Sequence, residues 1–166
     1  MSGLINSAGS KSGVIENYYS KINQPAFSVW SSDSNQTVGQ AAWTTWAHNQ
    51  TELDNKGGVH ANNYYEVQSG DNGYWFLIGT VHWGGTIEST ETIAGAIFLN
   101  STEIQSVWAS PTFGGGDNMF CTVNAIVNAS VGSKFYLNGW HSGASTTVMM
   151  NGSDKNTTFM GFKLLI

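Results

Sequence analysis

The run YWFLIGTVHW at residues 74–83 constrains the fold most, because nearly every position carries an apolar or aromatic side chain. In a β-strand, successive side chains point to opposite faces. One face would carry Trp75, Leu77, Val81 and Trp83, and the other Tyr74, Phe76, Ile78 and His82. A sandwich strand needs one dry face, so the second face requires another cover. A symmetric neighbouring subunit is the simplest cover, with Tyr74, Phe76, Ile78 and His82 as its interface; a second internal layer is the alternative.

From Pro25 onward, short runs rich in aromatic and β-branched residues alternate with clusters of Gly, Asn, Asp and Ser. This pattern is typical of an all-β sandwich or barrel. Further strands are predicted at 26–30, 41–48, 62–68, 92–99, 103–109, 119–129, 134–140 and 157–166. No segment shows an apolar period of 3.6 residues over a helical length.

The run at 119–129 indicates a strand with one dry face, because Cys121, Val123, Ala125 and Val127 alternate with mostly polar residues. Cys121 is therefore expected to be a small buried hydrophobe. It is the single cysteine and cannot form an internal disulfide, which favours synthesis in a reducing cytoplasm.

The composition excludes several classes of partner. The chain has 166 residues, which suits one domain with an extension, and charged residues make up 10% where about 25% is usual. There is no arginine, the six lysines are scattered, and the net charge is −5. Nucleic-acid binding needs clustered Lys and Arg, so it is not expected, and neither is binding to an anionic membrane surface. No run of 18 apolar residues occurs, so membrane insertion is not expected.

Residues 1–24 are predicted to be an N-terminal docking arm, and residues 25–166 the folded head. The arm is rich in Gly and Ser, and its candidate docking residues are Leu4, Ile5, Val14, Ile15, Tyr18 and Tyr19. A disordered tail is the alternative, since terminal segments are often disordered. The N-terminus lacks a basic start followed by an apolar stretch, so a signal peptide is not expected.

The order of motifs resembles the globular head of the complement subunit q and tumour necrosis factor superfamily. PAFSVW opens the domain, LDNKGGVHANNYYEVQSGDNGYWFLIGTVHW forms its middle, VNASVGSKFYLNGW comes late, and TFMGFKLLI closes it. The resemblance covers about residues 25–166. It implies a ten-stranded jelly-roll sandwich and a tight homotrimer, in which the strand matching 74–83 lies near the three-fold axis.

Family members bind other proteins or surfaces and have no catalytic centre of their own, so the resemblance implies a protein that is not an enzyme. Some members bind calcium at acidic loops. The loops at Asp71, Asp117 and Asp154 match no such motif, so no metal or other cofactor is assigned.

The arm sequence LINSAGSKSGVI resembles short N-terminal segments of bacteriophage virion proteins that precede β-rich heads. The chain departs from the animal complement proteins in lacking a collagen-like Gly-x-y stem. Together these features predict a free-standing head, made in the host cytoplasm and located in the virion.

Residue patterns for catalysis are not found in the sequence. The histidines have no i, i+4 pair of the zinc-protease type, and there is no Gly-x-Ser-x-Gly elbow, P-loop or dinucleotide fingerprint. The better candidates for contact with a ligand are Trp43, Trp46, Trp140 and His141, because tryptophan anchors many interfaces. The alternative is that these residues fill the core or the subunit interface.

The sequence therefore predicts a trimeric virion structural protein, either a capsid decoration protein or a tail-fibre or knob component. Its partners would be two further copies of itself and other virion proteins, contacted through the arm. A short arm with one small head favours decoration. The alternative is an adhesive head that binds a host receptor or surface glycan.

Overall fold

The computed structural model describes residues 24–32, 35–61, 63–84, 87–110, 119–143, 149–150 and 155–165. The predicted docking arm, with Leu4, Ile5, Val14, Ile15, Tyr18 and Tyr19, lies outside these residues except for Gln24. In the described part, no helix is long and apolar enough to cross a membrane.

The described residues form thirteen strands and no α-helix. The strands are β1 (Ala26–Trp30), β2 (Gln36–Thr37), β3 (Thr44–Thr45), β4 (Gln50–Asp54), β5 (Val59–His60), β6 (Tyr64–Glu66), β7 (Gly73–Gly84), β8 (Ile93–Leu99), β9 (Thr102–Ala109), β10 (Met119–Ala129), β11 (Lys134–His141), β12 (Met149–Met150) and β13 (Thr158–Lys163). The all-β prediction is confirmed.

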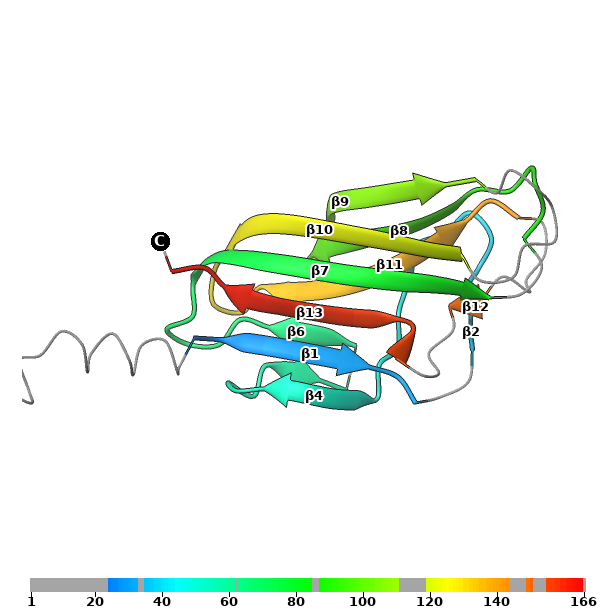
Figure 1. Ribbon diagram of the computed structural model, residues 1–166. Coiled ribbons are helices and arrows are strands. Elements are labelled where there is room, and N and C mark those ends of the chain that lie inside the picture. Colours follow the sequence, from blue (N-terminus) through cyan, green and yellow to red (C-terminus); the bar gives the residue numbers. More distant parts are fainter. Residues whose placement is uncertain are drawn as a thin grey trace, which may run out of the picture.

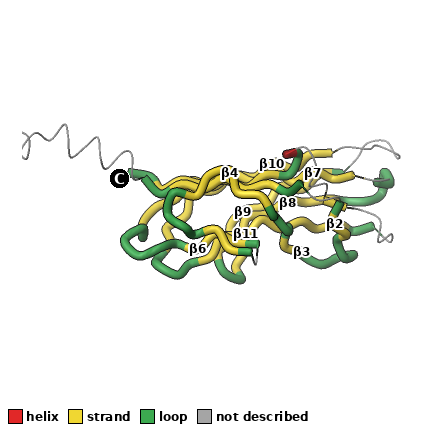
Figure 2. Tube along the Cα trace, turned by 90° about the horizontal axis from the view of Figure 1, so that it is seen from below, coloured by secondary structure: helices red, strands yellow, loops and turns green. Residues whose placement is uncertain are grey.

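The strands form two antiparallel sheets packed as two layers (Figures 1 and 2). The first sheet has the order β2-β12-β7-β13-β1-β4, with β10 also paired to β7. The second has the order β5-β6-β11-β8-β9, with β3 also paired to β11. Four of these strands, β2, β3, β5 and β12, have two residues each, and the other nine have three or more.

Buried aromatic rings hold the two sheets together. Phe27 of β1 stacks on Tyr65 of β6, with ring centroids 4.3 Å apart. Tyr65 also contacts Trp75 of β7 at 5.2 Å and Phe135 of β11 at 6.2 Å. Phe159 of β13 packs edge-on against Phe27 at 5.1 Å. Aromatic side chains contribute large buried areas, so these contacts between the layers are central to the core.

The predicted strands at 26–30 and 119–129 coincide with β1 and β10. The predicted strand at 41–48 is wrong in extent, because only Thr44 and Thr45 are in a strand. Ala41 adopts a positive φ of 51°, which breaks an extended run. Strand β4 has no counterpart among the predicted strands, because its sequence QTELD is mostly polar.

Residues 46–49 cross from the second sheet to the first. The Trp46 N–H donates to the Leu137 carbonyl of β11 at 2.9 Å. Three residues later, the Asn49 N–H donates to the Trp30 carbonyl of β1 at 3.3 Å. The side chains of Trp46 and His48 are buried along this crossing. This crossing segment therefore forms part of the wall at the edge of the sandwich where β4 begins.

Candidate functional site

The outer face of the first sheet, turned away from the second sheet, carries an array of apolar side chains. On β7 the inward residues Trp75, Leu77, Val81 and Trp83 are fully buried. The residues between them point outward and are flanked by outward residues of β10 and β13. We call the apolar members of this surface the apolar face: Leu53, Tyr74, Phe76, Ile78, Phe120, Ile126, Met160 and Phe162.

Strand register assembles the apolar face in rows. Phe76 lies opposite Ile126 of β10 on one side and Phe162 of β13 on the other. The Phe76 and Phe162 rings are 5.4 Å apart. In the next row, Ile78 lies opposite Met160. Ile126 is 62% exposed and Phe162 is 42% exposed, so this region of the single chain is open to water.

Three of the predicted interface residues, Tyr74, Phe76 and Ile78, belong to the apolar face. His82 also points to that side but is 3% exposed, because its ring stacks on Phe120 with centroids 4.3 Å apart. Phe120, which is 54% exposed, is the residue that reaches the surface there. The alternation in β10 and β13 could have identified Ile126, Met160 and Phe162, since each lies on the strand side opposite the core.

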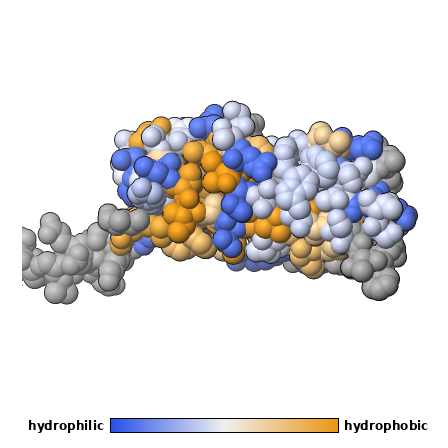
Figure 3. Space-filling model, turned by 90° about the horizontal axis from the view of Figure 1, so that it is seen from above, coloured by the Kyte–Doolittle hydropathy of each residue, from blue (hydrophilic) through white to orange (hydrophobic). Residues whose placement is uncertain are grey.

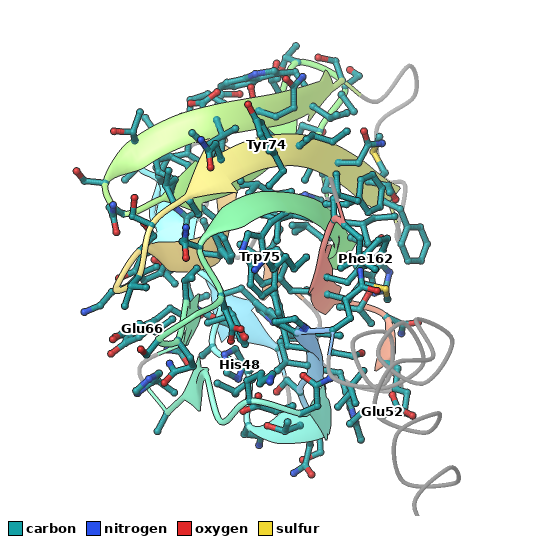
Figure 4. The ribbon with its side chains drawn as sticks, turned by 90° about the vertical axis from the view of Figure 1, so that its left-hand side faces the viewer. His48, Glu52, Glu66, Tyr74, Trp75 and Phe162 are labelled. Atoms are coloured by element: carbon teal, nitrogen blue, oxygen red, sulfur yellow. The ribbon has the colours of Figure 1, made fainter. Side chains whose placement is uncertain are left out.

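Figure 3 looks down on the β9 and β10 side of the head and shows hydrophobic residues gathered beside polar ones. The exposed apolar residues of these two strands include Val107, Phe120 and Ile126. Figure 4 shows the inward and outward arrangement from another side, with Trp75 between the sheets and Phe162 outside them.

A second aromatic group lies on the outer face of the second sheet, and we call it the tryptophan cluster. It consists of Trp43, Phe98, Trp108 and Trp140. The Trp43 ring lies 5.5 Å from Phe98 and 5.7 Å from Trp108, and Trp108 lies 4.8 Å from Trp140. Trp108 is 49% exposed, and its Nε1–H donates to the Ser106 hydroxyl at 3.0 Å. This cluster contains two predicted ligand-contact residues, Trp43 and Trp140, and adds Trp108.

The other two predicted ligand-contact residues lie in the core, which corrects their assignment. Trp46 and His141 are both buried. The His141 Nε2 is 2.8 Å from the Val38 carbonyl, so a hydrogen bond to the backbone holds the ring inside. Trp46 lies one residue beyond β3 and is fully buried.

Both surfaces are made mainly of apolar and aromatic side chains. Within the described ranges, no three His, Cys, Asp or Glu side chains gather as metal ligands would. Cys121 is buried, as predicted, and burial raises the pKa of its thiol, which disfavours the reactive thiolate.

No protein-family model matches this sequence, and no curated protein matches it. Solved structures do match. The globular domain of zebrafish complement 1qA superimposes with a TM-score of 0.62 at 12% identity, covering 86% of this chain and 98% of that one. Murine APRIL gives a TM-score of 0.62 at 13% identity, covering 85% and 99%. Eiger TNF from S. frugiperda gives 0.62 at 12% identity, covering 86% and 94%.

The head has a C1q/TNF-like jelly-roll fold. This confirms the resemblance drawn from the order of motifs. At 12–13% identity, the likeness is one of fold.

Within this jelly roll, the side chain of His48 is buried on the segment that crosses between the sheets. Burial lowers the pKa of His48 from 6.5 to about 4, because the interior disfavours the imidazolium form. The unfolded chain would take up this proton near pH 6.5. Between pH 6.5 and 4 the unfolded state therefore binds more protons, so the folded state loses stability as the pH falls.

We expect the free energy of unfolding to decrease from pH 6.5 to pH 4 through His48, by at most about 1.4 kcal/mol per pH unit. In His48→Phe this contribution should vanish, so the stability of the variant should depend less on pH. Urea unfolding between pH 6.5 and pH 4 measures how the free energy of unfolding changes with pH in the wild type and in His48→Phe. Trp108→Phe is a surface control. Parallel curves for the wild type and His48→Phe would contradict the assignment.

Proposed function

We propose that this chain is a homotrimeric structural protein of a bacteriophage particle, in which the jelly-roll head forms the trimer and residues 1–24 attach it. On this proposal the head binds and does not catalyse. The observation that carries the trimer is the apolar face, which the single chain leaves uncovered.

The apolar face has the properties of an interface that is buried in the assembled protein. Soluble monomers seldom expose large contiguous apolar areas, and such areas mark interaction sites. The outward residues of β7, β10 and β13 include no Lys, Asp or Glu. Interface centres are likewise depleted of charge, since burying an unpaired charge is costly. Each large apolar side chain buried there would contribute about 1.5–3 kcal/mol.

Three-fold symmetry is what the C1q and tumour necrosis factor resemblance implies, with the strand corresponding to β7 near the axis. A closed trimer would place three copies of the apolar face against one another and leave no open end for further association. The virion role is supported by the resemblance of the N-terminal segment to phage proteins. Three arms on one trimer would attach with a joint strength above that of one arm.

An adhesive head that binds a host receptor or surface glycan is the second candidate function. The half-exposed Trp108, beside Trp43 and Trp140, favours it, because tryptophan often anchors binding. The tryptophan cluster lies on the second sheet, so it would stay accessible when the first sheet is covered.

We expect Ile126→Glu to break the trimer, because it would place three carboxylates in the apolar interface. Multi-angle light scattering at micromolar concentration should give three times the chain mass for the wild type and one chain mass for the variant. Val131→Glu is the matched control: Val131 is 54% exposed and lies in the turn between β10 and β11. A monomeric wild type, or a trimeric Ile126→Glu, would refute the assembly through this face.

The virion role predicts that the chain is present in density-purified particles of the phage that encodes it. An abundance close to that of the major capsid protein would identify a decoration protein, and a small fraction of that abundance would identify a fibre or knob.

Deletion of residues 1–24 should abolish attachment to the particle and leave the trimer intact. Absence from the particle would contradict the virion role, and loss of host-cell binding in Trp108→Ala would favour the adhesive one.

A further inference from the structure

A cavity of about 390 Å³ opens at the edge of the sandwich where β4 of the first sheet and β5 of the second come near each other without pairing. It is lined by His48, Asn49, Thr51, Val59, His60 and Ala61. Its volume is within the range of small-molecule sites, about 300–1,000 Å³. Figure 4 shows His48 in this lower part of the head, between Glu66 on one side and Glu52 on the other.

The backbone around the cavity is held in place by hydrogen bonds. The crossing segment, residues 46–49, is tied to β11 at one end and to β1 at the other. The Asp54 carboxylate accepts four backbone N–H groups, from Lys56, Gly57, Gly58 and Val59, at 2.8–3.2 Å. This turn fixes the start of β5 and with it the Val59 and His60 side of the cavity.

His48 is the buried polar residue in the wall of the cavity, with its side chain 7% exposed. Its ring lies beside that of Trp46, with ring centroids 6.0 Å apart. With its pKa lowered by burial, the ring is neutral at physiological pH and offers one donor and one acceptor.

The other walls add neutral hydrogen-bonding groups and a small apolar surface. The Asn49 Oδ1 accepts the Ser32 N–H at 2.9 Å, and in the described part of the chain its Nδ2 has no partner. Thr51 contributes a hydroxyl, and Val59 and Ala61 contribute methyl groups. None of the six lining residues is Lys, Asp or Glu.

We propose that this cavity binds a neutral sugar residue. Sugar hydroxyls both donate and accept hydrogen bonds, which matches a lining of imidazole, amide and hydroxyl groups. The apolar C–H face of a sugar ring would lie against Val59 and Ala61. A charged ligand would enter without a counter-charge in the lining, at a desolvation cost. A metal ion would find two imidazoles there, fewer than the three or four protein ligands typical of zinc.

The site is independent of the proposed trimer. Thr51 lies opposite Val29, a core residue, so its side chain is on the inner side of the first sheet. The apolar face is on the outer side of the same sheet. A variant can therefore lose sugar binding and remain a trimer, or lose the trimer and still bind the sugar.

The test uses the full chain at neutral pH with glucose, galactose, mannose and N-acetylglucosamine as separate probes, followed by amide chemical-shift mapping. At least one sugar should bind at millimolar concentration and shift the amides of residues 48–51 and 59–61. His48→Phe keeps the ring size and removes the hydrogen bonds, and Ala61→Trp narrows the opening from the exposed side. Each should weaken binding at least about tenfold, which is about 1.4 kcal/mol.

Val131→Ala is the surface control and should leave the affinity unchanged, because Val131 lies in the turn between β10 and β11 and does not line the cavity. No binding by any of the four sugars would overturn the proposal, as would full affinity in both cavity variants. Binding of Zn²⁺ alone, with shifts at His48 and His60 and no response to sugar, would also overturn it. Light scattering on the same samples reports the oligomeric state separately.

Discussion

Strand β7 carries apolar side chains on both of its faces. On the inner face, Trp75 joins the aromatic contacts between the sheets, and Leu77, Val81 and Trp83 extend the core. On the outer face, Phe76 lies between Ile126 of β10 and Phe162 of β13, and Ile78 lies between Asn124 of β10 and Met160 of β13. The second sheet of the same chain covers the inner face. The outer face is uncovered in the single chain, and the proposed trimer would cover it.

The period-two pattern was sufficient to predict most of the sandwich. It places β1 and β10 correctly, and it separates the two faces of β7. It fails at β4, since the edge strand QTELD buries little and carries no apolar alternation. It also fails at 41–48, where the positive φ of Ala41 and the crossing after Thr45 depend on contacts with β11 that the local sequence does not encode.

The candidate sites show the same limit. Tyr74, Phe76 and Ile78 follow from alternation alone, whereas the burial of His82 depends on Phe120, which is 38 residues away and becomes its neighbour through strand register. Trp43 and Trp140 were recognisable by residue type, but their partner Trp108 needed the pairing of β8 with β9. The cavity beside His48 joins segments from two sheets, so no single motif could reveal it.

The apolar face, the tryptophan cluster and the cavity beside His48 all have few charged side chains. With 10% charged residues, the chain presents an apolar face without Lys, Asp or Glu in its rows on β7, β10 and β13, and a cavity without them in its lining. In the tryptophan cluster, Glu103 lies opposite Phe98. They lie on different parts of the head: the outer face of the first sheet, the outer face of the second sheet, and the edge where β4 and β5 come near each other. The apolar face contains the most hydrophobic residues of the three, so the proposed trimer depends chiefly on whether this face is covered.

Oxidation of Met160 tests most directly whether neighbouring subunits cover the apolar face. Met160 is 40% exposed on the apolar face of the single chain, and peroxide oxidises accessible methionine to the sulfoxide. Peptide mass spectrometry can follow its rate in the native wild type and in Ile126→Glu. If subunits bury the face, Met160 in the wild type will be oxidised much more slowly than in the variant. Equal, fast oxidation in both would show that the face is open to water and would contradict the assembly.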